Sequence, residues 1–393
     1  MSAMADAASK PAIIQAEVEG NRLQLLVGGR ERLDALTRLI DEAKVDLRLL
    51  YYMFSGDEAG ERVRDALVRA AWRGVDVRLL VDGFGCGSTE PGFLDSLKEA
   101  GGHYCIFHSS YGRRYLIRNH QKMAIADGER ALVGGANINL QYLDDDSDDR
   151  WRDLWMSVEG PTIADLAKYF DAIESWTRRP KPKIRDLRRI ITSHSRGKGK
   201  VSWRFSGPMR RHNPWPAQIV SDICNAKRVD IIAAYFAPSN AMLRRIGSVV
   251  AGGGIARVIT AAKSDNTATI AAARFTYGRL LKRRVKIYEY QASKLHTKLY
   301  IADDVVHIGS SNFDFRSLYL NLEMMLRVDD SDFAAAMHAY VDHEIADSLE
   351  ITQAFHRRRA TLWRKMKWAA AHFLVTTMDY TVTRRVNFGS EGL

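Results

Sequence analysis

The sequence predicts an α/β protein of two similar lobes, each a mixed β-sheet flanked by helices. Apolar strands alternate with helical segments along most of the chain, a pattern typical of a sheet covered on both faces. A polar motif in the first half also occurs again in the second half, and the strands before it are repeated with it. We therefore expect an internal duplication, with the two lobes related by a pseudo-twofold axis.

The elements of the first half follow from apolar runs and the residues that bound them. Ser55 and Glu58 have the spacing of a capping box, so we expect Ser55 to cap the helix that follows it. Gly74 is expected to end that helix. The expected order is strand 22–27, helix 31–43, buried strand 45–54, the capped helix, strand 75–82, a helix around 93–100 and the strand HYCIF.

The second half repeats this order. The segment DIIAAYF corresponds to the strand ending in YYMF, and IARVITAA after Gly254 corresponds to VDVRLLV after Gly74. The remaining expected elements are a helix over 267–281 and a strand over 285–290.

The repeated motif places a histidine, a lysine and an aspartate at fixed spacing, followed by two small residues and an asparagine. Each copy has the alternation of a strand, a tight turn and a second strand. Side chains two apart share a face of a strand, so each histidine should point the same way as its lysine. An imidazole beside an ammonium group is more typical of a phosphate-binding site than of a hydrophobic core. The two copies are His120, Lys122, Asp127, Gly134, Gly135 and Asn137, and His296, Lys298, Asp303, Gly309, Ser310 and Asn312.

Composition limits the class of protein. The chain has 393 residues, a formal charge of +11 and a pI near 9.5, which favours an anionic partner, either nucleic acid or an acidic lipid surface. Three widely spaced cysteines indicate neither a disulfide framework nor a zinc site and favour a reducing compartment. We expect no signal peptide and no membrane-spanning helix, and thus a soluble or peripheral protein.

Two basic segments have alternative interpretations. Residues 177–200 contain ten basic residues and one acidic residue, and are expected to be an exposed linker that is either merely solvated or attracted to an anionic membrane. From Phe355 to Leu374 we expect one basic amphipathic helix, with Phe355, Leu362, Trp363, Met366, Ala370 and Phe373 on one arc. That helix could lie at a membrane interface or pack on the second lobe.

The acidic run DDDSDD, residues 144–149, could suggest a metal site. It lacks the glycine and distal glutamate of a calcium loop, so a solvated loop is the better interpretation. We predict no metal and no cofactor.

The duplicated motif resembles that of the phospholipase D superfamily. VKIYEY before His296, NFDFRSLYLNLE after Gly309–Ser311, GGANIN, WRDLWMSVEGP and YYMF…GVDVRLLVDG are similar to bacterial cardiolipin synthases over residues 20–345. The second copy has one residue fewer between its aspartate and glycine, which a shorter hairpin turn would absorb. Gly135 stands where a serine is usual, which removes a possible phosphate-facing hydroxyl.

The resemblance implies domain limits. We expect a mobile tail at 1–20, a first phospholipase D-like lobe at 21–176, the basic linker at 177–200, a second lobe at 201–350 and a C-terminal basic helix and tail at 351–393.

The resemblance also implies roles. His120 would be the nucleophile and His296 the general acid and base, although the residues themselves leave that order open. Lys122 and Lys298 would supply positive charge to phosphate, with Asn137, Asn312 and Ser310 as neutral donors. Asp153 and Glu323 are expected to orient the histidines, in preference to Asp127 and Asp303, which belong to the catalytic motif but lie at hairpin turns.

The expected reaction moves a phosphatidyl group between phosphatidylglycerol molecules and releases glycerol, at the cytoplasmic face of the cell membrane. Tyr51, Tyr52, Phe54, Tyr235 and Phe236 could line the lipid route or be ordinary core aromatics. Phospholipase D hydrolysis, a phosphodiesterase or nuclease on the same site, and a catalytically idle lipid-binding protein remain alternatives. The flanking motifs and the C-terminal helix disfavour nucleic acid, and no feature predicts an oligomeric state.

Overall fold

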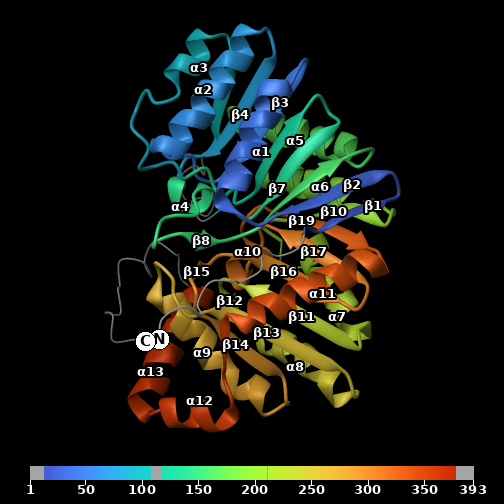
Figure 1. Cartoon of the computed structure of the whole chain (residues 1–393), viewed down its shortest axis with the longest axis vertical. Helices are drawn as coiled ribbons and strands as arrows, with labels where there is room; N and C mark the ends of the chain where they lie inside the picture. The colour runs from blue at the N-terminus through green and yellow to red at the C-terminus, as the bar shows by residue number, and fades with distance from the viewer. Residues whose placement is uncertain (1–12, 108–116, 210, 378–393) are drawn as a thin grey trace, which may run out of the picture.

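Each half of the chain forms a β-sheet with helices on its faces, which confirms the predicted fold class (Figure 1). The computed structural model describes residues 13–107, 117–209 and 211–377. Within these residues each sheet has eight strands. Seven of them are equivalent in order between the lobes, while β1 is added at one edge of the first sheet and β20 at the opposite edge of the second.

The first sheet has the strand order β1-β2-β9-β7-β6-β3-β4-β5. The pairs β3–β4 and β4–β5 are parallel, and the other neighbours are antiparallel. The strands are β1 Gln15–Val18, β2 Asn21–Leu26, β3 Asp46–Tyr51, β4 Asp76–Asp82, β5 His103–Phe107, β6 Lys122–Ala126, β7 Arg130–Gly134 and β9 Trp155–Glu159. The helices are α1 Gly29–Glu42, α2 Glu58–Trp72, α3 Asp95–Glu99, α4 Leu140–Leu143, α5 Ile163–Thr177 and α6 Ile184–His194.

The second sheet has the order β10-β19-β17-β16-β11-β13-β14-β20, with parallel pairs at the equivalent places. Its strands are β10 Val201–Ser206, β11 Arg228–Ala233, β13 Ile255–Ala261, β14 Lys286–Tyr290, β16 Lys298–Ala302, β17 Val305–Gly309, β19 Glu323–Asp329 and β20 Ser348–Glu350. The helices are α7 Pro214–Asn225, α8 Asn240–Ala251, α9 Thr267–Leu281, α10 Phe315–Tyr319, α11 Ser331–Ala346, α12 Gln353–Arg359 and α13 Leu362–Thr377. Two small parallel pairs complete the fold: β8 Trp151–Arg152 with β15 Lys294–Leu295, and β12 Phe236–Ala237 with β18 Phe313–Asp314.

One hydrophobic core is shared by the two lobes. It joins apolar residues of α5 and the first sheet to apolar residues of α11 and the second sheet. The outer faces of the sheets have separate cores, under α1 and α2 in the first lobe and under α7, α8 and α9 in the second. Since burial of apolar area is the main stabilising contribution, the shared core holds the lobes in a fixed relation.

The start of α2 differs from the prediction. Asp57, not Ser55, is its N-cap, and the Asp57 carboxylate accepts a hydrogen bond from the Gly60 amide at 3.0 Å. The Ser55 hydroxyl accepts instead from the Asn139 side chain. A side chain at Gly60 would collide with the Ser55 carbonyl, so this tight entry depends on glycine.

The predicted N-terminal tail is also partly ordered. Gln15–Val18 pairs antiparallel with β2, because Ile14, Ala16 and Val18 contact the shared core. Residues 1–12 lie outside the described part of the chain.

The basic segment 177–200 is not an exposed linker throughout. Its centre forms α6, in which Leu187 and Ile191 are fully buried and the intervening arginines face outward. Apolar residues four apart fall on one face of a helix, and here that face packs on the shared core.

The C-terminal segment forms two helices rather than one, because Ala360 and Thr361 between α12 and α13 are not helical. Helix α13 packs on α9 through Trp368 and Ala371. Within the described residues, no helix has the length and apolar character needed to cross a membrane.

Candidate active site

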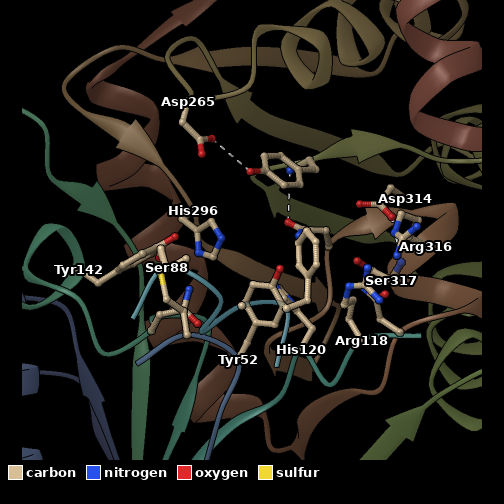
Figure 2. Close-up of a pocket in the computed structure, with 17 residues that line it drawn as sticks. Tyr52, Ser88, Arg118, His120, Tyr142, Asp265, His296, Asp314, Arg316 and Ser317 are labelled. Atoms are coloured by element: carbon tan, nitrogen blue, oxygen red, sulfur yellow. Dashed lines mark hydrogen bonds between the residues drawn. The ribbon is translucent and has the colours of Figure 1, made fainter. Parts of the chain in front are cut away.

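A cavity of about 270 Å³ lies between the two lobes and takes residues from both (Figure 2). His120 lies just before β6 and His296 just before β16, and both imidazoles line this cavity. The structure therefore brings the histidines of the two motif copies into one site.

Backbone contacts between the lobes hold the two histidines in place. The His120 amide donates to the Leu322 carbonyl at 2.9 Å, and the Leu322 amide donates to the Arg118 carbonyl at 2.8 Å. At the equivalent place, the His296 amide donates to the Arg152 carbonyl at 2.8 Å, beside the β8–β15 pair. Each histidine is thus attached through its main chain to the opposite lobe.

Each imidazole also contacts a carboxylate of the opposite lobe. His120 Nδ1 lies 3.0 Å from Glu323 Oε2, and His296 Nδ1 lies 2.5 Å from Asp153 Oδ2. A carboxylate on Nδ1 fixes the ring and leaves Nε2 as the nitrogen available for chemistry. Asp153 and Glu323 are therefore in the positions expected of orienting groups, with the pairing crossed between lobes.

The carboxylates of Asp153 and Glu323 have different neighbours, and this explains why glycine stands at position 135, where a serine is usual. The Ser310 hydroxyl donates to Glu323 Oε2 at 2.6 Å. At Gly135 an added Cβ would lie 2.4 Å from Asp153 Oδ1, so the first lobe has no room for a serine there. Ser310, which was predicted to contact phosphate, is buried, and its hydroxyl faces Glu323 rather than the cavity.

The motif lysines are buried behind the imidazoles. Lys122 Nζ donates to the His120 carbonyl at 2.6 Å, and Lys298 Nζ contacts His296 through both its carbonyl and Nδ1. Burial lowers the pKa of Lys122 to about 7, with Glu323 opposing the shift and Lys298 adding to it. Burial likewise lowers the pKa of Lys298 to about 8, against the attraction of Asp153.

Burial also lowers the pKa of both histidines. For His120, Glu323 opposes the shift and Lys122 adds to it. For His296, burial and Lys298 together lower the pKa to about 3 in spite of Asp153. Both imidazoles are therefore neutral near pH 7 in the free protein, and either Nε2 could act as a nucleophile.

Asn137 and Asn312 line the cavity at equivalent places. Asn312 Oδ1 accepts from the Tyr235 amide at 3.3 Å. Asn137 Oδ1 is buried and has no hydrogen-bond partner within the described residues. Since an unpaired buried polar atom is costly, this amide is suited to a polar ligand in the cavity.

Asp127 and Asp303 lie away from the cavity, at the turns of the motif hairpins. Both have positive φ, and their carboxylates accept backbone amides. Asp127 accepts from residues 44–46 at the start of β3, and Asp303 from Lys227 and Arg228 at the start of β11. This supports the prediction that they hold the turns and leave the orienting role to Asp153 and Glu323.

The predicted lipid-route aromatics divide into two groups. Tyr52 and Tyr235 line the cavity, and the Tyr52 ring contacts His120 at 4.9 Å between centroids. The other three, Tyr51, Phe54 and Phe236, are fully buried in the outer cores, so a lipid-route role for them is wrong. Side chains alternate along a strand, which separates neighbours such as Tyr51 and Tyr52.

Several cavity residues were not predicted. Arg118 and Tyr142 line the cavity together with His120 and His296 (Figure 2). Arg118 also contacts the ring of Phe84, another lining residue, and the Tyr142 ring contacts His296 edge-on. Arg118 is two residues from His120, and Asp314, Arg316 and Ser317 belong to the NFDFRS segment, so their proximity to the motifs was a usable signal. Asp265, two residues before α9, gave no such signal.

The acidic run has a structural role. Asp145 accepts from the amides of Gly29 and Arg30 and so caps α1, while Asp144 and Asp146 pair with the Arg30 side chain. Asp149 pairs with Lys294 of the second lobe. These carboxylates bind the loop to α1 and to β15.

Comparisons with known proteins show which sequences this chain resembles. The family model described as "Cardiolipin synthase, PLD-like domain" matches residues 36–173 and 219–345. A cardiolipin synthase of Listeria monocytogenes is 28% identical over 91% of this chain and 75% of its own length. Cardiolipin synthase A of Pseudomonas aeruginosa is 29% identical over 84% of this chain and 68% of its own length.

Two solved structures share the fold. The phosphatidylserine synthase of Haemophilus influenzae has a TM-score of 0.68 and 16% identity, covering 93% of this chain and 97% of that one. The polyphosphate kinase of Porphyromonas gingivalis has a TM-score of 0.58 and 13% identity, covering 89% of this chain and 53% of that one. With the duplicated motif, the two-lobed fold and a family match over both halves, the chain belongs to the phospholipase D-like family of cardiolipin synthase domains.

Proposed function

We propose that the protein is a phosphatidyltransferase that joins two phosphatidylglycerol molecules into cardiolipin through a phosphohistidine intermediate. The observation that carries this proposal is that two imidazoles from different lobes line one cavity, each in contact through Nδ1 with a carboxylate. The family and its cardiolipin synthase members support a phospholipid substrate.

In the first step, His120 Nε2 attacks the phosphorus of one phosphatidylglycerol. A phosphorus–nitrogen bond forms and the bond to the glycerol oxygen breaks, while His296 gives its proton to that oxygen. The phosphate brings a negative charge beside His296, which raises the pKa of its imidazole and allows it to carry the proton when substrate is bound.

In the second step, a hydroxyl group of another phosphatidylglycerol replaces the histidine. His296 takes the proton from this hydroxyl, its oxygen bonds to phosphorus, and the bond to His120 breaks. Water in the same position would give phosphatidic acid, so hydrolysis competes with transfer at one site.

Positive charge near the phosphate comes from protein side chains. Lys122 and Lys298 are close to the imidazoles, and Asn137 and Asn312 present amides to the cavity. Donors fixed in a buried site stabilise developing charge more strongly than they would in water.

We also propose that the protein works at the cytoplasmic face of an anionic membrane. Helix α13 packs on α9 through one face and exposes Leu362, Trp363, Met366 and Phe373 on the other. Exposed apolar residues flanked by Arg364, Lys365 and Lys367 suit a helix lying at an anionic lipid surface.

The test is product analysis in the presence of EDTA. The protein is incubated with vesicles containing labelled phosphatidylglycerol and, separately, with single-stranded DNA. Cardiolipin with released glycerol is expected. Phosphatidic acid alone would identify a hydrolase, cut DNA a nuclease, and no turnover a lipid-binding protein.

Trapping the intermediate tests the order of the histidines. The His120→Ala and His296→Ala variants should each abolish turnover. Acid-labile label on the protein is expected with His296→Ala and not with His120→Ala, and the reverse result would make His296 the nucleophile.

A further inference from the structure

A second, larger groove lies outside the catalytic cavity, between α9 and the α12–α13 hairpin. Its volume is about 510 Å³, compared with about 270 Å³ for the catalytic cavity. Figure 1 shows α12 and α13 in red beside α9, at the end of the second lobe away from the first. Neither the motifs nor the proposed reaction uses this groove.

The rim of the groove is strongly basic. Arg279 of α9 and Lys282, the residue that follows α9, face Arg357 of α12 and Lys365 of α13. All four side chains are exposed. In the described part of the chain, no acidic side chain forms an ion pair with any of them. The nearby carboxylate of Glu289 is buried and pairs with Arg274 and Arg359. The groove therefore carries an uncompensated positive charge.

The floor of the groove is apolar. Phe275, Leu281, Ala360 and Trp368 line it, and the His356 ring stacks on Trp368 at 5.5 Å between centroids. A basic rim over an apolar floor matches a molecule with an anionic head and an apolar tail.

The groove also lies next to the exposed apolar face of α13. Leu362 and Trp363 are 75% and 79% exposed and precede Lys365, which belongs to the rim. Helix α13 also contacts α10, which carries Arg316 and Ser317 of the catalytic cavity. One helix thus connects the groove, the apolar face and the catalytic site.

We infer that the groove between α9, α12 and α13 binds one anionic phospholipid molecule of the membrane at a site separate from the catalytic cavity. The four rim cations hold the phosphate, and Phe275, Leu281 and Trp368 pack against an acyl chain. The inference rests on the proposed function for its choice of a membrane lipid. A lipid held there would keep α13 on the bilayer while a second lipid molecule reacts in the catalytic cavity.

Gly278 provides a variant that fills the groove without changing its charge. An added Cβ there would lie 3.4 Å from His356 Nε2, an ordinary contact, and it would point into the groove. Gly278→Leu should therefore occupy the lipid site. Gly278→Ala is the matched control, because it makes the same backbone change and adds one carbon.

A second pair of variants removes charge. Lys282→Gln with Arg357→Gln takes two cations from the rim. Lys286→Gln with Arg358→Gln takes two exposed cations from neighbouring positions that do not line the groove.

Binding is measured by calorimetry with the full chain carrying His120→Ala, so that lipid is not consumed. The probe is dihexanoyl phosphatidylglycerol below its micelle concentration, with glycerol 3-phosphate in a parallel titration. We expect two lipids per chain. Gly278→Leu and the rim pair should weaken one site by tenfold or more, while Gly278→Ala and the control pair bind as the parent does.

Two results would overturn the inference. One is an unchanged titration for Gly278→Leu, which would show that the groove holds no lipid. The other is equal affinity for glycerol 3-phosphate at the groove, which would make it a site for free phosphate. The proposed function is judged separately, by turnover with both histidines intact. Normal turnover by a parent chain that binds no lipid in the groove would contradict this inference alone.

Discussion

Glu323 Oε2 lies 3.0 Å from His120 Nδ1, although the two residues are 203 positions apart and belong to different lobes. Asp153 and His296 repeat the relationship in the opposite direction. Neither lobe by itself therefore contains both an imidazole and the carboxylate that orients it. The catalytic site depends on the packing of the two halves.

Replacing Glu323 with glutamine should inactivate the enzyme without unfolding it. A neutral amide no longer fixes the tautomer of His120 or stabilises its charged form. Loss of such a carboxylate lowers kcat by on the order of 10²-fold or more. Asp153→Asn should have a similar effect through His296, measured as kcat on phosphatidylglycerol alongside Tm. If kcat stayed within about threefold of the parent enzyme, the carboxylates would not orient the histidines.

The small residue after each motif glycine should tolerate substitution differently in the two lobes. Gly135→Ala places a methyl group against the Asp153 carboxylate, so it should displace that group and lower kcat strongly. Ser310→Ala removes a single hydrogen bond to Glu323, worth about 1 kcal/mol, and should have a smaller effect. Equal losses in the two variants would contradict this asymmetry.

The pH dependence of kcat/KM should follow the buried lysines on its alkaline side. The pKa values of Lys122 and Lys298 are lowered to about 7 and about 8, so a rise in pH through this range removes positive charge from the free enzyme. We expect kcat/KM to fall above about pH 7, because this parameter reports the free enzyme.

The acidic limb of the kcat/KM profile should lie at unusually low pH. The proposed attack requires a neutral imidazole, and the pKa of both histidines is lowered from 6.5. Activity should therefore persist below pH 6.5 and be lost only on further acidification. A profile that rose steadily to pH 9, or that was lost already at pH 6.5, would contradict these assignments.

The exposed face of α13 should bind vesicles without contributing to the fold. Leu362→Ser with Trp363→Ser changes side chains that are 75% and 79% exposed, so the free energy of unfolding should change by about 0.5 kcal/mol or less. The fraction of protein that sediments with phosphatidylglycerol vesicles should fall several-fold.

Trp72 is the control for that experiment, because it is 73% exposed but lies on α2 in the first lobe. Trp72→Ser should leave vesicle binding unchanged. Truncation before α13 would be a poorer test, since it would also uncover the part of α9 that Trp368 and Ala371 cover. Equal binding by both serine variants would exclude α13 as the docking face.

The helix inside the basic segment should contribute to stability. Ile191 is fully buried against the shared core, and Ile191→Ala should destabilise the protein by about 2–5 kcal/mol. Thr192→Ala, on the outer face of α6, should change the unfolding midpoint little. A midpoint unaffected by Ile191→Ala would mean that the segment behaves as the solvated linker that its charge suggests.

Much of the local structure was readable from sequence because it depends on neighbouring residues. Apolar alternation predicted the strands that begin just after His120 and His296, and the positions of Asp127 and Asp303 at the ends of those strands indicated turns. Predictions from charged composition were wrong where buried apolar residues determined the structure. Segment 177–200 has the composition of a linker, yet its centre forms a helix that buries Leu187 and Ile191 against the shared core. At Ser55 the capping pattern was present, but Asp57 lies closer to the free amides and takes the role.

From the sequence we could predict two equivalent lobes, each with a histidine and a lysine two positions apart at the start of a motif strand, because these features depend only on local spacing and apolar alternation. Three relationships could be seen only in the folded chain: each histidine contacts a carboxylate of the other lobe, Ser310 donates to Glu323, and a basic groove forms beside α13. Those relationships join residues far apart in the chain, and packing of the shared core, not local spacing, sets which of them meet.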